Sequence, residues 1–169
     1  MFHDLCMMDS LSDYSSARYV LFGVPFDGTS SFRAGSRWAP DAMRKASANF
    51  ETYNSYFDID FEDLLIHDAG NFEPYSDVEK TLEELFFAVE PIVKDGKIPI
   101  MMGGEHSLTY PCVKACAKHA GEDIGFVVMD AHFELREEYG GVKFNHACVS
   151  RHILNDITDK YVTIGVRSG

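Results

Sequence analysis

The stretch FVVMDAHFEL, residues 126–135, carries the main information about both the fold and the candidate site. An apolar run of strand character stops at Asp130, and His132 and Glu134 follow at steps of two residues. Side chains two positions apart in an extended chain share a face, so we expect these three groups to point to one place. Carboxylates and neutral imidazole suit Mn, Fe, Co, Ni or Zn, and MDAHFE contains no lysine or arginine to neutralise them. The stretch therefore predicts a buried strand ending in a metal site; the alternative is a solvated polar loop that needs no ion.

Apolar runs of strand character alternate with helical patterns along the rest of the chain. Strands are predicted at residues 18–26, 64–70, 97–102, 123–130 and 161–166, and helices at 40–50, 76–96, from Tyr110 onward, and at 146–157. We expect Ser76 to cap the long helix in a capping box with Glu79, and Gly96 to end it. Continuous apolar strands separated by helices predict a three-layer α/β/α fold with a parallel sheet covered on both faces.

Composition narrows the class of protein. The chain has 169 residues, of which 46% are hydrophobic, so we expect one domain over residues 1–169. Its net charge of -12 argues against binding to nucleic acid or to an anionic membrane, and favours a small cationic partner. No leader and no apolar run of roughly 20 residues is evident, so we expect a soluble cytoplasmic protein. The four cysteines lack Cys-x-x-Cys spacing and are expected to be reduced.

Polar motifs follow several of the predicted strands, where ligands bind in parallel α/β sheets. They are Asp27, His67 with Asp68, GGEHS at 103–107, and DAHFE at 130–134. Within GGEHS, His106 is a further candidate metal ligand, and the two glycines would allow a close approach of the backbone. Histidine can move protons because the unperturbed pKa of imidazole lies near neutral pH, so His146, in NHAC, is a candidate for that role. A partly exposed histidine at a helix start is the simpler interpretation.

The order of these motifs resembles that of the ureohydrolase family (arginases, agmatinases and formimidoylglutamases), most closely its agmatinase branch. The matching segments are GVPFDGTSSFRAGSRWAPDAMR, HDAGNF, GGEHSLTYP, DAHFELREEYGGVKFNHACVSR and YVTIGVRSG. They extend over nearly the whole chain, and the pair GGEHS and DAH is highly specific. The resemblance implies an arginase-like parallel sheet.

The resemblance also implies a chemistry that residue spacing alone does not. The family binds two Mn ions that activate a water for attack on a guanidinium carbon, as in the hydrolysis of agmatine to putrescine and urea. His106, Asp130 and His132 match family metal ligands, and Glu134 stands where the family usually has aspartate. His146 matches a histidine implicated in proton transfer or substrate contact, and Asn145 is a second predicted substrate contact. A small cationic guanidino substrate is implied, with a homo-oligomer or association with a C-terminal half.

Family members are nearly twice as long, and their later Asp-x-Asp ligand motif has no counterpart here. We therefore expect the N-terminal part of a ureohydrolase-like domain, truncated after the fifth strand, with an exposed sheet edge and at most one bound ion. One alternative is a non-catalytic remnant that acts as a binding or assembly partner. Another is a mononuclear metal-binding module with a different hydrolytic activity.

Overall fold

The computed structural model describes residues 5–121 and 124–168, and the chain divides into two compact units. The first contains residues 1–27, 35–74 and 91–104, and the second contains residues 28–34, 75–90 and 105–169. A single domain over residues 1–169 stays a prediction. Among the described residues, none of the helices has the length and apolar character that crossing a membrane requires.

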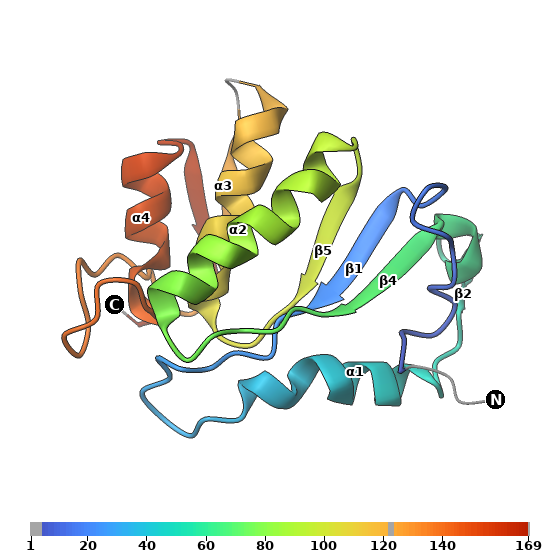
Figure 1. The fold of residues 1–169 in the computed structure, drawn as a ribbon, viewed down its shortest axis with the longest axis horizontal. Coiled ribbons are helices and arrows are strands. Elements are labelled where there is room, and N and C mark those ends of the chain that lie inside the picture. The colour runs from blue at the N-terminus through green and yellow to red at the C-terminus, as the bar shows by residue number, and fades with distance from the viewer. Residues whose placement is uncertain (1–4, 122–123, 169) are drawn as a thin grey trace. The chain divides into compact units, whose positions relative to one another are not determined.

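Three parallel strands form the centre of the first unit (Figure 1). Strand β1 (Tyr19–Gly23) lies between β4 (Ile66–Asn71) and β5 (Ile98–Met102) and pairs in parallel with both. Four of the five residues of β1 are buried, as an apolar run predicts for a central strand. These three predicted strands and their parallel arrangement are confirmed.

One helix and several short elements accompany this sheet in the first unit. Helix α1 (Ala39–Ser47) has proline near its first position, as the sequence indicates. Two-residue strands β2 (Tyr53–Asn54) and β3 (Ile59–Asp60) form an antiparallel hairpin that the sequence analysis did not predict. The elements η1 (Ser36–Trp38) and η2 (Phe61–Leu64) are short 3-10 helices.

The glycine pair was expected to let the backbone pass close to an ion or to the next loop, and the close approach that the structure shows is at Gly104, against an earlier segment. A Cβ atom at this position would collide with the backbone of Phe26, which follows β1. Gly103 has open space around it, so the steric requirement belongs to its neighbour alone. Gly104 thus allows the chain after β5 to pass against the chain after β1.

The second unit is built on the parallel pair β6 (Phe126–Met129) and β7 (Tyr161–Ile164). Helices α3 (Thr109–Ala120) and α4 (Val149–Asp156) follow the 3-10 helices η3 (His106–Leu108) and η4 (His146–Cys148). One face of β6 packs on α4, since Phe126 and Val128 share a buried cluster with Val149 and Ile153. The predicted order of strands and helices is confirmed here as well.

The other face of the β6–β7 pair is uncovered. It carries Val127, Met129, Val162 and Ile164, and each of these residues is more than half exposed. The covering of both faces predicted for the sheet is therefore not seen for this pair among the described residues, and an exposed apolar face here is what the expected truncation after the fifth strand implies. Within the second unit, the four residues form an exposed apolar surface.

Helix α2 (Val78–Lys94) begins differently from the prediction. The side chain of Asp77, one residue after the predicted cap Ser76, accepts a hydrogen bond from the backbone N–H of Lys80 at 2.7 Å. Asp77 therefore caps this helix, with the usual geometry of an acidic N-cap. At the other end Gly96 adopts a φ of 73°, so its predicted role in ending the helix is confirmed.

Candidate metal centre

The candidate site lies in the second unit, directly after β6. Strand β6 ends at Met129, and the chain bends at Ala131 and His132. Glu134 adopts a left-handed φ of 53°. The premise that residues 130–134 are extended is therefore wrong, because the side chains converge through a bend and a left-handed residue, not through the alternation of a strand.

His106, Asp130 and Glu134 are brought together in space. Each offers one ligand atom, and these atoms lie within 4.8 Å of one another. His106 Nδ1 is 3.4 Å from Asp130 Oδ2. Two ligands bound at roughly 2.1 Å from one ion are about 3.0–3.5 Å apart when they subtend 90–110°. The spacing of His106 and Asp130 therefore fits two ligands of one divalent ion, and the oxygen and nitrogen donors of the group suit a transition metal.

His132 lies at the edge of this group. Its Nδ1 is 3.4 Å from Asp130 Oδ1 and 3.5 Å from Glu134 Oε1. Its side chain is 57% exposed, whereas that of Glu134 is only 11% exposed. The structure thus places His132 near the two carboxylates but outside the tighter group of three, and its role as a metal ligand stays a prediction.

The electrostatics of the group favour a bound cation. Burial and the nearby charge of Asp130 raise the pKa of Glu134, although His132, His146 and Arg136 partly offset these effects. Burial lowers the pKa of His106, against the opposing influence of Asp130. A neutral imidazole keeps the lone pair that a metal ligand needs, and a cation would relieve the repulsion between the carboxylates.

Glu105, next to His106, holds the loop that contains Thr29, and the sequence analysis did not single it out. The residue is 7% exposed, and its carboxylate accepts hydrogen bonds from the backbone N–H of Thr29 at 2.6 Å and from the Ser107 hydroxyl at 2.6 Å. The Thr29 hydroxyl also donates to Glu105. The one sequence signal was an acidic residue directly beside His106 in GGEHS.

His146 stands at the start of η4, next to the loop that contains Thr29. Its ring nitrogens lie near two hydroxyls, with Nδ1 3.4 Å from Thr29 Oγ1 and Nε2 3.5 Å from Ser31 Oγ. A positive charge on His146 lowers the pKa of His106 and of Glu134, so the His146 ring is close to these two candidate metal ligands. This placement is compatible with the predicted role in proton transfer, which stays a prediction.

Asn145 is committed to the backbone around it. The residue is 2% exposed, and its amide donates to the carbonyls of Tyr139 at 2.7 Å and Val142 at 3.3 Å. Its side-chain oxygen Oδ1 accepts a hydrogen bond from the backbone N–H of Ala147 at 2.8 Å and caps η4. Asn145 thus braces the turn before His146, and a direct contact with substrate stays a prediction.

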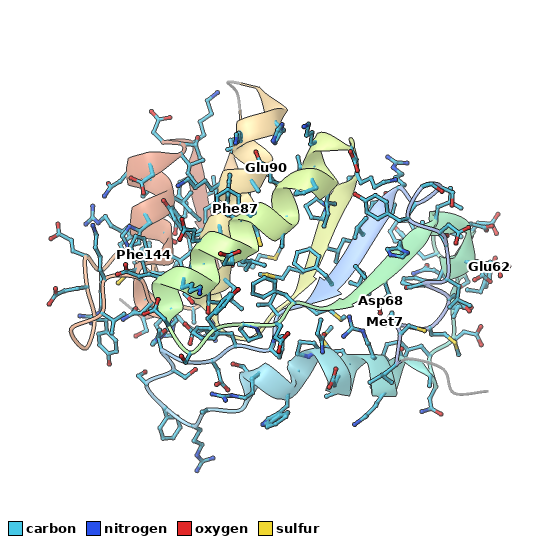
Figure 2. All side chains as sticks on the ribbon, viewed as in Figure 1. Met7, Glu62, Asp68, Phe87, Glu90 and Phe144 are labelled. Carbon is cyan, nitrogen blue, oxygen red and sulfur yellow. The ribbon has the colours of Figure 1, made fainter. Side chains whose placement is uncertain are left out.

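The remaining polar motifs, Asp27 and the pair His67 and Asp68, lie in the first unit. Asp27 binds Arg37, whose Nε donates to it at 2.5 Å. Asp68 binds the buried Arg44 through two bonds of 2.8 and 2.7 Å and lies beside Met7 (Figure 2). The carboxylates of Asp27 and Asp68 are therefore each paired with an arginine side chain.

These observations agree with comparisons against known proteins. The chain belongs to the arginase family, because the profile of that family matches residues 17–169. The predicted membership of the ureohydrolases and the arginase-like α/β fold are thereby confirmed.

Several proteins similar to this chain are agmatinases or related ureohydrolases. The chain is 40% identical over 159 residues to an agmatinase of Pyrococcus horikoshii, and 39% identical over 162 residues to an N(1)-aminopropylagmatine ureohydrolase of Thermococcus kodakarensis. These alignments cover 93% and 94% of this chain but 54% of each relative. The agmatine ureohydrolase of Thermoplasma volcanium superposes with a TM-score of 0.92 at 41% identity, over 99% of this chain and 56% of that one. The chain spans about half the length of the curated relatives it matches.

Proposed function

We propose that this chain is part of a manganese-dependent ureohydrolase that hydrolyses a small guanidino compound such as agmatine to putrescine and urea. The observation that carries this proposal is the group of His106, Asp130 and Glu134, whose ligand atoms lie within 4.8 Å of one another. Similarity to agmatinases supports the substrate class. The net charge of -12 would attract a cationic substrate.

The residues have separate roles in this proposal. His106, Asp130 and Glu134 would hold Mn, with His132 as a further ligand at the rim. Bound Mn would supply a Lewis acid that lowers the pKa of a coordinated water. His146 would move a proton between the reacting groups, and the turn braced by Asn145 would keep its ring in place. The chain alone would hold at most one ion, because the donors gathered in the described residues form one group.

We further propose a single cytoplasmic domain that assembles with other polypeptide chains. The apolar surface of Val127, Met129, Val162 and Ile164 supports this, since such a surface is usually covered in a working protein. The partner would be a C-terminal ureohydrolase half or further copies of the chain. If the chain has no activity in any assembly, the same surface would favour the alternative of a non-catalytic binding partner.

Calorimetric titration with MnCl₂ and a urea-release assay test the proposal together. The wild-type chain should bind Mn, and His106→Ala should bind it at least tenfold more weakly. His119→Ala is a matched control, because His119 pairs with Glu90 at the surface and should leave Mn binding unchanged. Urea release from agmatine, and not from arginine or guanidinobutyrate, would assign the substrate. Absence of Mn binding by the wild-type chain would refute the metal site.

A further inference from the structure

A line of hydrogen-bonding groups connects Glu105 to the ring of His146 through Thr29. The Thr29 hydroxyl donates to Glu105, and the Thr29 backbone N–H donates to the same carboxylate at 2.6 Å. On its other side, Thr29 Oγ1 is 3.3 Å from the backbone nitrogen of His146 and 3.4 Å from Nδ1 of its ring. All of these atoms lie in the second unit.

The direction of each bond follows from which groups can donate. The carboxylate of Glu105 receives three donors, two from Thr29 and one from Ser107, which is the arrangement of an ionised acceptor. A threonine hydroxyl has one proton, and this proton is directed to Glu105. Thr29 Oγ1 can then only accept hydrogen bonds from His146, so the His146 atoms that contact this oxygen must be donors. The backbone N–H of His146 is such a donor, and ring Nδ1 must be one too.

We propose that Glu105, acting through Thr29, holds neutral His146 in the tautomer with its proton on Nδ1. Nε2 is then the atom that carries the free lone pair and accepts a proton. Both Glu105 and Thr29 are positioning residues for His146, because they act through its ring. The assignment of the tautomer is independent of the reaction, and its consequence for catalysis rests on the proposed hydrolysis.

The consequence is a defined site for proton uptake. When Nε2 accepts a proton from a reacting group, the Nδ1–H bond is retained and the ring becomes an imidazolium. Thr29 Oγ1 and the negative charge of Glu105 then stabilise that positive charge. The Ser31 hydroxyl is 3.5 Å from Nε2 and can donate to it when substrate is absent. A wrong tautomer would leave the reacting group facing an N–H instead of a base.

The test is a long-range ¹H–¹⁵N correlation spectrum of the histidine rings in the 169-residue chain, without Mn and without substrate. It is recorded about two pH units above the ordinary histidine pKa of ~6.5, so that the ring is neutral. A His146→Gln variant assigns the signals. We expect the pattern of a protonated Nδ1 and an unprotonated Nε2 in the wild type. A protonated Nε2 in the wild type would overturn the inference.

Variants at Thr29 separate the hydroxyl from the shape of the side chain. Thr29→Val removes the hydroxyl and should give a mixture of tautomers or the Nε2–H form. Thr29→Ser keeps the hydroxyl and should retain the wild-type pattern. Unchanged signals from His67 and His119 would show that Thr29→Val is folded. A Thr29→Val spectrum identical to the wild type would overturn the role of Thr29.

Glu105→Gln provides an independent check. An amide can itself donate to Thr29 Oγ1, which frees the hydroxyl to donate to His146, so the tautomer preference should weaken or reverse. A preserved preference would overturn the part played by Glu105. These spectra do not depend on metal or turnover. An Nδ1–H tautomer in a chain that binds no Mn would refute the proposed function alone, whereas Mn binding with an Nε2–H tautomer would refute this inference alone.

Discussion

Replacing Glu134 with glutamine should stabilise the metal-free protein and remove its stabilisation by Mn. Glu134 and Asp130 offer oxygens within 4.8 Å of one another. Two unit charges at that separation repel by about 3.5 kcal/mol at an effective dielectric constant of 20. The side chains are only 11% and 22% exposed, so solvent screens this repulsion incompletely.

Neighbouring groups reduce the net effect. His132, His146 and Arg136 each act to lower the pKa of Glu134 and therefore favour its charged form. We expect the free energy of unfolding of metal-free Glu134→Gln to rise by about 1 kcal/mol, a fraction of the bare repulsion. In contrast, Mn at 100 times its Kd would stabilise the wild type by about 2.7 kcal/mol and the variant by much less.

Urea denaturation with and without Mn measures both parts of this prediction. Glu137→Gln is a matched control, because Glu137 is an exposed glutamate of the same loop and should shift stability by less than about 0.5 kcal/mol. A metal-free Glu134→Gln protein that is less stable than wild type would refute the repulsion. A full stabilisation of Glu134→Gln by Mn would show that Glu134 does not bind the ion.

Three further predictions concern the framework around the site. Arg44→Met should lower the free energy of unfolding by about 3–5 kcal/mol, because Asp68 would retain a buried charge without its partner. Urea denaturation measures this free energy, and a decrease of less than about 1 kcal/mol would contradict the prediction. Burial raises the pKa of Asp68, but hydrogen bonds from Arg44, Met7 and Gly70 together hold it below its usual value. The stability from this pair is therefore complete above about pH 4 and is lost as the pH falls through the folded pKa; an Asp68→Asn variant with the same acid dependence would argue against it. Asn145→Ala should destabilise the protein by about 1–2 kcal/mol through loss of its cap, as thermal unfolding would show. Asn145→Asp should not restore the stability, because a buried carboxylate cannot donate to the carbonyls of Tyr139 and Val142.

The strands could be predicted because their signal is local. Four of the five parallel strands are apolar runs that overlap the predicted positions, whereas β4 (Ile66–Asn71) is largely polar and begins two residues later than predicted. The hairpin of β2 and β3 could not be predicted in this way, since its strands have two residues each and are largely exposed. The cap of α2 was misplaced by one residue, because Ser76 and Asp77 are both favourable caps and only geometry distinguishes them.

The site could be predicted only in part. His106, Asp130 and Glu134 do meet, but the reason given from sequence was wrong, because Glu134 reaches the group through a left-handed residue. The roles of Glu105 and Thr29 depend on a contact between residues 76 positions apart, which residue spacing does not reveal. His146 could be recognised from the family motif, whereas its hydroxyl partners required coordinates.

Anomalous diffraction at the manganese edge from a crystal of the chain soaked in MnCl₂ tests the metal site most directly. The predicted result is one strong peak about 2.0–2.3 Å from His106 Nδ1 and from an oxygen of each of Asp130 and Glu134. The peak should vanish in Asp130→Asn crystals soaked in the same way. A wild-type crystal without a peak among these three side chains, at Mn concentrations that load other sites, would contradict the account.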